Sequence, residues 1–326
     1  MNFNLNKCAL VLIVLLTAIS STFPANAQIN SAPAPAQGTP CDRGCLTGFV
    51  DQYLAALVAH DPRKLPLAED VVFTENAVRL NLGQALWSTA TGLGSFKIYA
   101  ADPYSNQAGF IGVVMENGAP KILALRLQIK NGKIKEIETF VARNILDRDF
   151  PRSLATREAK PIWGETLQAS ESVSRTEMIG AANQYFEGVE QNTGEIVPFD
   201  QSCNRTENGL QTTNNPALTP PGGKGGGVNF GAMGCKEQFN SGSINQWTMP
   251  ERHFWMVDEQ HGIVFGVFMF TVSGKPNPTS PGGLTPRQPE PWTRPVAEMF
   301  KIKNGRIYEI EALVGTQLAY GTHSGW

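Results

Sequence analysis

The chain has 326 residues and a formal net charge of −2 at pH 7, and charged residues make up 17% of it. This balance provides neither the basic surface of a nucleic-acid-binding protein nor a polybasic segment for an anionic membrane. We therefore expect no nucleic acid and no membrane surface as partner. The length exceeds what one small hydrophobic core usually organises, so two domains are predicted.

The N-terminus has the pattern of a secretory signal peptide. An apolar run over residues 9–19 follows a lysine, and the small-residue pattern Ala25-Asn26-Ala27 comes after it. Segments of this kind are removed on export. We predict a signal peptide at 1–27, a flexible segment at 28–40, and a secreted or periplasmic protein.

Four cysteines remain after the signal peptide, and in an oxidising compartment an even number predicts disulfides. The pairing of Cys41 with Cys45 and of Cys203 with Cys235 is favoured, because each pair lies within one predicted domain. Two other pairings stay open. The four histidines are scattered along the chain, so neither a metal site nor any cofactor is predicted.

An internal repeat organises the rest of the chain. Thr74-Glu75-Asn76 recurs as Thr206-Glu207-Asn208, and Ile129-Lys130-Asn131-Gly132 recurs as Ile302-Lys303-Asn304-Gly305. Repetition of this kind indicates two copies of one structural unit. The second copy is longer, because Gly/Pro-rich insertions occupy 212–245 and 274–294.

Each copy begins with a helical pattern and ends with a hairpin pattern. Apolar residues between Leu46 and Leu57 follow helical spacing, and Ser174 with Glu177 forms the pattern of a capping box. The Asn-Gly pairs at 131–132 and 304–305 lie between alternating apolar segments, which is typical of tight hairpin turns.

These patterns predict an α+β protein of two tandem cone-shaped domains, each with N-terminal helices packed on a curved antiparallel sheet. The first domain is placed at 41–150, a linker at 151–173, and the second domain at 174–320. A monomer with its two domains packed together is expected.

The order of elements around Val71 to Asn76 resembles the cone fold of nuclear transport factor 2, ketosteroid isomerase and scytalone dehydratase. The segments at 41–46 and 51–62 also resemble a secreted two-repeat family that is common in filamentous fungi. The wider resemblance implies an apolar pocket between sheet and helices, with acids or histidines supplying the chemistry. The acids of this chain do not align with the catalytic positions of those enzymes, so no residue role is carried over.

Glu75 and Glu207 are the first candidate catalytic residues, because they occupy the same place in both copies. A carboxyl group in an apolar pocket has a raised pKa and can transfer protons at neutral pH. The alternative is that Thr-Glu-Asn is a structural element bonded to backbone amides. Glu138 and Glu311 form a second matched pair, and strand alternation places Glu138 toward the concave face together with Ile134 and Phe140.

Asp258 and His253 are the candidates specific to the second copy. A histidine beside an acid can shuttle protons near neutral pH, and His253 has no clear counterpart in the first copy. Asp102 and Asp258 each follow a predicted strand that ends in aromatic residues, and His253 and His261 flank the second of these strands. A surface strand with one satisfied histidine is the alternative.

The leading functional hypothesis is a secreted, cofactor-independent acid/base enzyme of the lyase, dehydratase or isomerase type. Its substrate would be a small hydrophobic or aromatic molecule. Two alternatives stay open: a noncatalytic protein that binds such a molecule, and a structural or interaction module whose pockets are filled by its own side chains. Asn204-Arg205-Thr206 is also an acceptor pattern for N-glycosylation in a eukaryotic source.

Overall fold

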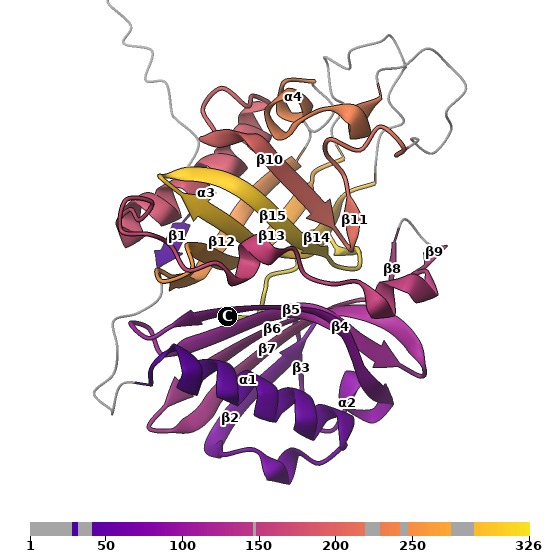
Figure 1. Cartoon of the computed structure of the whole chain (residues 1–326). Coiled ribbons are helices and arrows are strands. Elements are labelled where there is room, and N and C mark those ends of the chain that lie inside the picture. Colours follow the sequence, from indigo (N-terminus) through magenta and orange to yellow (C-terminus); the bar gives the residue numbers. More distant parts are fainter. Residues whose placement is uncertain (1–27, 32–40, 146–147, 219–228, 242–246, 275–289) are drawn as a thin grey trace, which may run out of the picture.

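The computed structural model describes residues 28–31, 41–145, 148–218, 229–241, 247–274 and 290–326. The predicted signal peptide, residues 32–40 and parts of both Gly/Pro-rich insertions lie outside these ranges. Within these ranges the chain forms two large sheets and a small two-stranded one, and each large sheet carries a long helix on one face (Figure 1). This is the predicted α+β architecture of two sheet-based domains.

The first domain consists of one long helix, a short helix and six strands. Its strand order is β3-β2-β7-β6-β5-β4, and all neighbours are antiparallel except the parallel pair β2 and β7. The elements are α1 (Arg43–Val58), β2 (Leu67–Glu75), β3 (Val78–Leu80), α2 (Leu86–Thr89), β4 (Ala90–Asp102), β5 (Gln107–Glu116), β6 (Ala119–Lys130) and β7 (Lys133–Ala142).

The second domain repeats this order of elements. The strands of this domain follow β12-β13-β14-β15-β10-β11, and within this order β10 and β15 are the parallel neighbours. The elements are α3 (Arg175–Gln191), β10 (Phe199–Glu207), β11 (Leu210–Gln211), α4 (Cys235–Asn240), β12 (Trp247–Asp258), β13 (Ile263–Val272), β14 (Trp292–Lys303), β15 (Arg306–Val314) and β16 (Leu318–Ala319).

Short elements connect the two domains. They are β8 (Asn144–Ile145), β9 (Arg148–Asp149) and the 3₁₀ turns η2 (Arg152–Thr156) and η3 (Pro161–Gly164), while η1 (Pro62–Lys64) and η4 (Phe230–Ala232) lie inside the domains. The connecting segment contributes apolar side chains, including Leu154 and Trp163, to the space between the sheets.

The local signals in the sequence explain where the elements begin and turn. Asp42 caps α1 by accepting a hydrogen bond from the Cys45 amide at 2.8 Å, and the predicted capping box of Ser174 and Glu177 opens α3. Asn131 and Asn304 adopt positive φ values of 53° and 51°, as the predicted hairpin turns require.

Three apolar cores hold the chain together. Two lie between a sheet and its helix, and the third lies between the two sheets (Figure 1). In the third core, Ile98 and Val113 of the first sheet pack in one cluster with Phe265 and Met299 of the second. The sheets therefore face each other, and α1 and α3 lie on their outer faces.

The structure differs from the predicted segments in two places and adds a helix in a third. Residues 28–31, predicted to be flexible, form β1 (Gln28–Ser31), which pairs in parallel with β12 because the edge of that sheet offers free backbone groups. The insertion predicted at 212–245 contains α4, which a disulfide attaches to the domain. The second insertion ends earlier than predicted, since β14 already begins at Trp292.

Both favoured disulfides are present: Cys41 is bonded to Cys45, and Cys203 to Cys235. Within the described part of the chain, no cluster of three or more His, Cys, Asp or Glu side chains has the arrangement of a metal site. None of the helices in the described ranges is long and apolar enough to cross a membrane.

Candidate functional site

Glu75 of the first domain has contacts that favour a structural role. Its side chain is buried, and its Oε2 accepts a hydrogen bond from the Leu86 amide at the start of α2 at 3.0 Å. Its Oε1 accepts one from the Arg143 guanidinium at 2.9 Å. Both carboxylate oxygens are thus bonded, one by a helix N-terminus, as the structural interpretation of Thr-Glu-Asn predicts.

Glu207, the repeat counterpart of Glu75, belongs to a different network. It forms an ion pair with the Arg205 Nε at 3.0 Å, and about a third of its side chain is exposed. Arg205 is buried, and its Nη1 donates a hydrogen bond to the Tyr185 hydroxyl at 3.3 Å. Tyr185 in turn hydrogen-bonds Glu298. A polar chain therefore runs from the surface at Glu207 to Glu298 in the interior.

Glu298 is the buried carboxyl group at the inner end of this network. It lies on β14 with only 3% of its surface exposed, and its Oε2 has no hydrogen-bond partner within the described ranges. Burial raises the pKa of Glu298 to about 8, although the positive charge of Arg205 opposes this shift. Burial also raises the pKa of Tyr185, so this phenol stays protonated at neutral pH.

The first domain carries no such network at the matching positions. In the repeat alignment Phe73 stands where the second domain has Arg205, and Leu125 stands where it has Glu298. Leu125 pairs across the sheet with Phe110 and Thr139, whereas Glu298 pairs with the smaller Gly266 and Ala312. At these two matching positions, therefore, only the second domain has ionisable side chains.

Aromatic rings surround Glu298. Phe186 of α3 contacts the Phe268 and Phe300 rings, with centroid separations of 4.0 and 5.8 Å, and Tyr185 lies 5.2 Å from Phe300. The Phe268 ring also occupies the space above Gly266. These contacts give the carboxyl group the apolar surroundings that raise its pKa.

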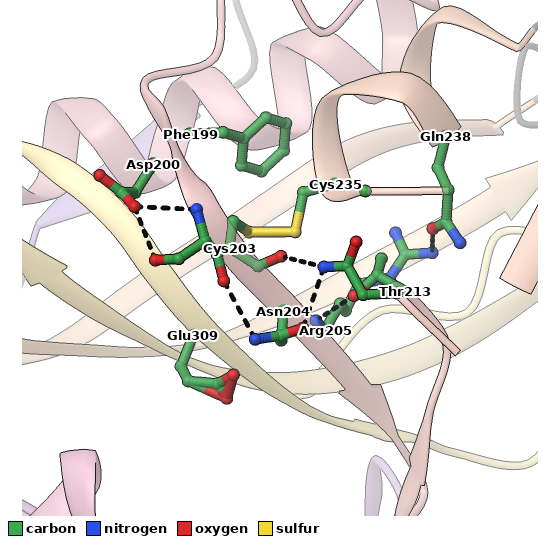
Figure 2. Close-up of a disulfide and its surroundings, with 12 residues drawn as sticks. Phe199, Asp200, Cys203, Asn204, Arg205, Thr213, Cys235, Gln238 and Glu309 are labelled. Atoms are coloured by element: carbon green, nitrogen blue, oxygen red, sulfur yellow. Dashed lines mark hydrogen bonds between the residues drawn. A yellow bond between two sulfur atoms is a disulfide. The ribbon is translucent and has the colours of Figure 1, made fainter. Parts of the chain in front are cut away.

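A disulfide attaches helix α4, which lies over this interior, to the sheet (Figure 2). Cys203 on β10 is bonded to Cys235 on α4, and Gln238 of α4 accepts a hydrogen bond from Arg205 Nη2 at 2.7 Å. The Arg205 amide donates to Thr213 Oγ1 at 2.8 Å. Helix α4 is therefore held directly beside the guanidinium that faces the interior.

Asp258 and Asp102 join the two domains. Asp258 Oδ2 accepts hydrogen bonds from the Ala101 amide at 3.1 Å and from Arg43 Nε at 3.0 Å, both in the first domain. Asp102 Oδ2 reciprocally accepts bonds from the Val257 amide and from Arg175. Burial raises the pKa of Asp258, but the hydrogen bond from His261 and the charge of Arg43 outweigh it, so the pKa lies below its ordinary value.

These reciprocal bonds favour a structural role for the two aspartates, which we name the interdomain aspartates. His253, the other candidate specific to the second copy, does not contact Asp258 in the described hydrogen bonds. Its Nε2 instead bonds Glu251 Oε1 at 2.8 Å, and its ring stacks on Trp255 with centroids 4.8 Å apart.

Glu138 does not face the concave side, contrary to the sequence interpretation. An extra residue, Lys135, interrupts the pairing of β6 and β7, so Ile134 faces the helix while Phe140 lies in the core between the sheets. Glu138 shares the face of Phe140 and bonds Arg126 Nε at 2.8 Å.

Glu311 also lies away from the interior, paired with the connecting segment. Both of its oxygens accept hydrogen bonds from Arg157, at 2.8 and 2.7 Å. Glu75, Asp258 and Glu311 are therefore all held in structural contacts. The network that ends at Glu298 is the remaining candidate site.

Sequence reasoning missed Glu298, although a signal for it existed. It stands among Val296, Ala297, Met299 and Phe300 in an apolar strand, where its repeat counterpart is Leu125. A carboxylate at a position where the other copy has a buried leucine is expected to be buried as well.

The chain was compared with known proteins. Residues 171–314 match the family described as "Domain of unknown function (DUF8021)", and this match spans α3 to β15. No curated protein matches the chain.

Solved structures match one domain-sized region at a time. An NTF2-like protein of unknown function from Cytophaga hutchinsonii is 13% identical, with 32% of this chain and 92% of that chain covered and a TM-score of 0.23. An NTF2-like protein from Anabaena variabilis is 13% identical, with coverage of 44% and 94% and a TM-score of 0.25.

A steroid delta-isomerase from Pseudomonas aeruginosa is 12% identical, with coverage of 31% and 82% and a TM-score of 0.23. At these scores the matches carry no argument, and the fold rests on the strand order described above.

Proposed function

We propose that the second domain is a cofactor-independent acid/base enzyme for a small apolar or aromatic molecule, with Glu298 as its proton-transfer group. The observation that carries this proposal is the buried carboxyl group with a pKa of about 8, at a position where the first domain has Leu125. Buried acids with strongly perturbed pKa values beside specific charged partners are typical of functional sites.

The neighbours of Glu298 have the chemistry that proton transfer needs. Deprotonated Glu298 would remove a proton from a carbon acid, and protonated Glu298 would return it. The Tyr185 hydroxyl and the Arg205 guanidinium lie beside it as donors for negative charge that develops on the substrate. This combination supports isomerase, dehydratase or lyase chemistry.

Glu207 gives this site its connection to solvent. Its carboxylate is partly exposed and paired with Arg205, which bonds Tyr185. We assign Glu207 the role of holding Arg205 in place rather than of transferring the proton. Because aromatic rings occupy the interior, a substrate would reach Glu298 only if buried side chains such as Phe239 of α4 moved aside.

The proposal can be tested with 5-nitrobenzisoxazole, a small aromatic compound that opens its ring after loss of a single proton. The base takes the C3 proton, the N–O bond breaks, and the coloured 2-cyano-4-nitrophenolate forms. We expect catalysis by the purified protein to increase as pH rises through about 8, because Glu298 must be ionised to act as base. Glu298→Gln should lower the rate about 100-fold or more.

Glu75→Gln is the matched control, since it changes the repeat counterpart of Glu207 in the other domain and should leave this rate unchanged. A protein that accelerates the reaction no more than acetate does, or whose rate is independent of Glu298, would contradict the proposal.

The dense ring packing supports a second candidate, a structural module with a filled interior. In that case the rate would stay at the acetate level, and neither the glutamine variant nor added aromatic compounds would change the thermal unfolding midpoint. Binding without catalysis would instead raise that midpoint with ligand concentration.

A further inference from the structure

Helix α4 places a buried polar side chain, Gln238, against the Glu298 network. Gln238 comes from the insertion that makes the second copy longer than the first, and it is fully buried. Its Oε1 accepts a hydrogen bond from Arg205 Nη2 at 2.7 Å (Figure 2). A buried amide group is tolerated only where its polar atoms are paired, so the partners of Gln238 define its role.

The hydrogen bonds of Gln238 fix the direction in which its amide group points. Its Nε2 donates to the backbone carbonyl oxygens of Thr212 and Phe230, at 2.5 and 2.8 Å. Carbonyl oxygens only accept hydrogen bonds, so the NH₂ group must face them and the side-chain oxygen must face Arg205. The amide is therefore oriented by the insertion itself to act as an acceptor for the guanidinium.

Attachments at both ends of α4 hold this amide in place. The disulfide joins Cys235, the first residue of the helix, to Cys203 on β10. At the other end, Asn240 Oδ1 accepts a hydrogen bond from the Gly194 amide at 2.7 Å. Because the helix is fixed at both ends, its amide group can hold the guanidinium in position instead of following it.

Arg205 is also attracted toward the protein surface. Its Nε pairs with the partly exposed Glu207 carboxylate at 3.0 Å. Its inward contact, from Nη1 to the Tyr185 hydroxyl, is longer, at 3.3 Å. Since short hydrogen bonds are the stronger ones, the 2.7 Å bond to Gln238 is the contact that best opposes a shift of the guanidinium toward Glu207.

Gln238 holds Arg205 without adding a negative charge. A glutamate at this position would give the guanidinium a second carboxylate partner besides Glu207. Burial raises the pKa of Glu298, and the positive charge of Arg205 acts against this shift. A neutral acceptor preserves the influence of Arg205 on Glu298, whereas a charged one would cancel part of it.

We propose that Gln238 is a positioning residue for the Glu298 site: it fixes the Arg205 guanidinium beside Tyr185 without bringing a second carboxylate to it. Gln238 acts through Arg205 and contacts no reacting atom. The inference rests on the proposed proton transfer by Glu298. Its physical effect, the placement of a positive charge near Glu298, can nevertheless be measured without catalysis.

Two replacements of nearly the same size as glutamine test this proposal. Gln238→Met removes the acceptor, and Gln238→Glu replaces it by a carboxylate. Both should raise the pKa of Glu298, and the glutamate variant should raise it more, because it adds a negative charge as well. Carbon-13 NMR of the glutamate carboxyls measures the titration, and the signal that disappears in Glu298→Gln identifies Glu298.

The ring opening of 5-nitrobenzisoxazole should follow the same order. At pH 7 a smaller fraction of Glu298 would be ionised in both variants, so the pH of half-maximal rate should move upward. The rate at pH 7 should fall about tenfold in Gln238→Glu, and less in Gln238→Met. A residue that merely stabilised the fold would lower the thermal unfolding midpoint without this dependence on charge.

Asn240→Ala is the matched control, because it loosens α4 at its other end and removes no hydrogen bond to Arg205. It should lower the thermal unfolding midpoint but leave the titration of Glu298 unchanged. The proposal would be overturned if neither Gln238 variant shifted that titration, or if Asn240→Ala shifted it equally.

The two proposals about this site can fail separately. If the Gln238 variants shift the titration as expected while the rate is independent of Glu298, the positioning of Arg205 is upheld and proton transfer by Glu298 is refuted. If the rate depends on Glu298 but not on Gln238, the reverse holds.

Discussion

The interiors of the two domains show how one fold accommodates two kinds of core. In the first domain Phe73 and Leu125 complete a dry core, and the Tyr53 hydroxyl is satisfied by Trp87 Nε1 at 3.0 Å. In the second domain the matching tyrosine, Tyr185, joins Arg205 and Glu298. The ionisable network of the second interior thus includes two positions, Arg205 and Glu298, at which the first domain has apolar residues.

This difference assigns different tasks to the two copies. At the two matching positions the first domain buries apolar side chains, which stabilises the fold by about 25 cal/mol per Å² of surface. The second keeps a carboxyl group whose burial is costly unless it is protonated or paired. Four changes to the chain test this difference between the two interiors.

Removal of the disulfide of the second domain should have the largest effect on stability. Cys203 and Cys235 are 32 residues apart, whereas Cys41 and Cys45 are 4 apart. The chain-entropy relation gives about 4 kcal/mol for the longer loop and about 2 kcal/mol for the shorter. Replacing each pair by serines and measuring urea unfolding checks the difference. Equal losses would show that α4 gains nothing from its attachment.

Loss of either interdomain aspartate should destabilise both domains by a similar amount. Asp102→Ala and Asp258→Ala each leave a buried backbone amide and an arginine without their partner, which costs about 3 kcal/mol. Differential scanning calorimetry of the two variants measures this. A loss confined to the Asp258 variant would mean that the reciprocal contacts are not energetically equivalent.

Giving the second interior the residues of the first should remove a pH dependence of stability. Because the pKa of Glu298 is raised to about 8 in the folded protein, its stabilising contribution is complete below the unfolded value of 4.5 and is lost as pH rises toward 8. Arg205→Phe combined with Glu298→Leu should abolish this decline and, at pH 7, raise the unfolding free energy by about 2 kcal/mol.

Unfolding of this double variant at several pH values between 5 and 9 provides the measurement. Phe73→Leu in the first domain is the control and should keep the pH dependence of the parent protein. A double variant that still loses stability between pH 5 and 8 would mean that other buried acids, such as Glu311, cause the decline.

Removal of the two matching tyrosine hydroxyls should have the smallest effect on stability. The two variants should nevertheless differ in their effect on the pKa of Glu298. Tyr53→Phe and Tyr185→Phe should each cost about 1 kcal/mol. The hydrogen bond from Tyr185 lowers the pKa of Glu298, so only Tyr185→Phe should raise that pKa further. Carbon-13 NMR of the glutamate carboxyls follows this titration, and an unchanged Glu298 signal would contradict the network.

The sequence predicted the architecture well because its strongest signals are local. Asn-Gly turns, the capping box at Ser174 and the alternation along the closing strands each depend on a few neighbouring residues. The favoured cysteine pairing was confirmed, since each pair lies within one domain.

The site was harder to predict, because burial depends on contacts between distant segments. Glu75 stood out as a repeated acid, yet its partner Arg143 lies beyond the last strand of its sheet. The single extra residue at Lys135 turned Glu138 to the opposite face, which strict alternation does not anticipate. Glu298 was missed for a related reason, since only comparison with its repeat counterpart Leu125 indicates that it is buried.

The reciprocal bonds of Asp102 and Asp258 also limit how the chain can be divided. Each aspartate completes the strand end of the other domain, so neither half retains all its bonds when it is alone. A fragment cut to residues 171–314 would expose Phe265, Met299 and their neighbours to water. The two halves therefore form one unit, in which each sheet shields the apolar face of the other from water.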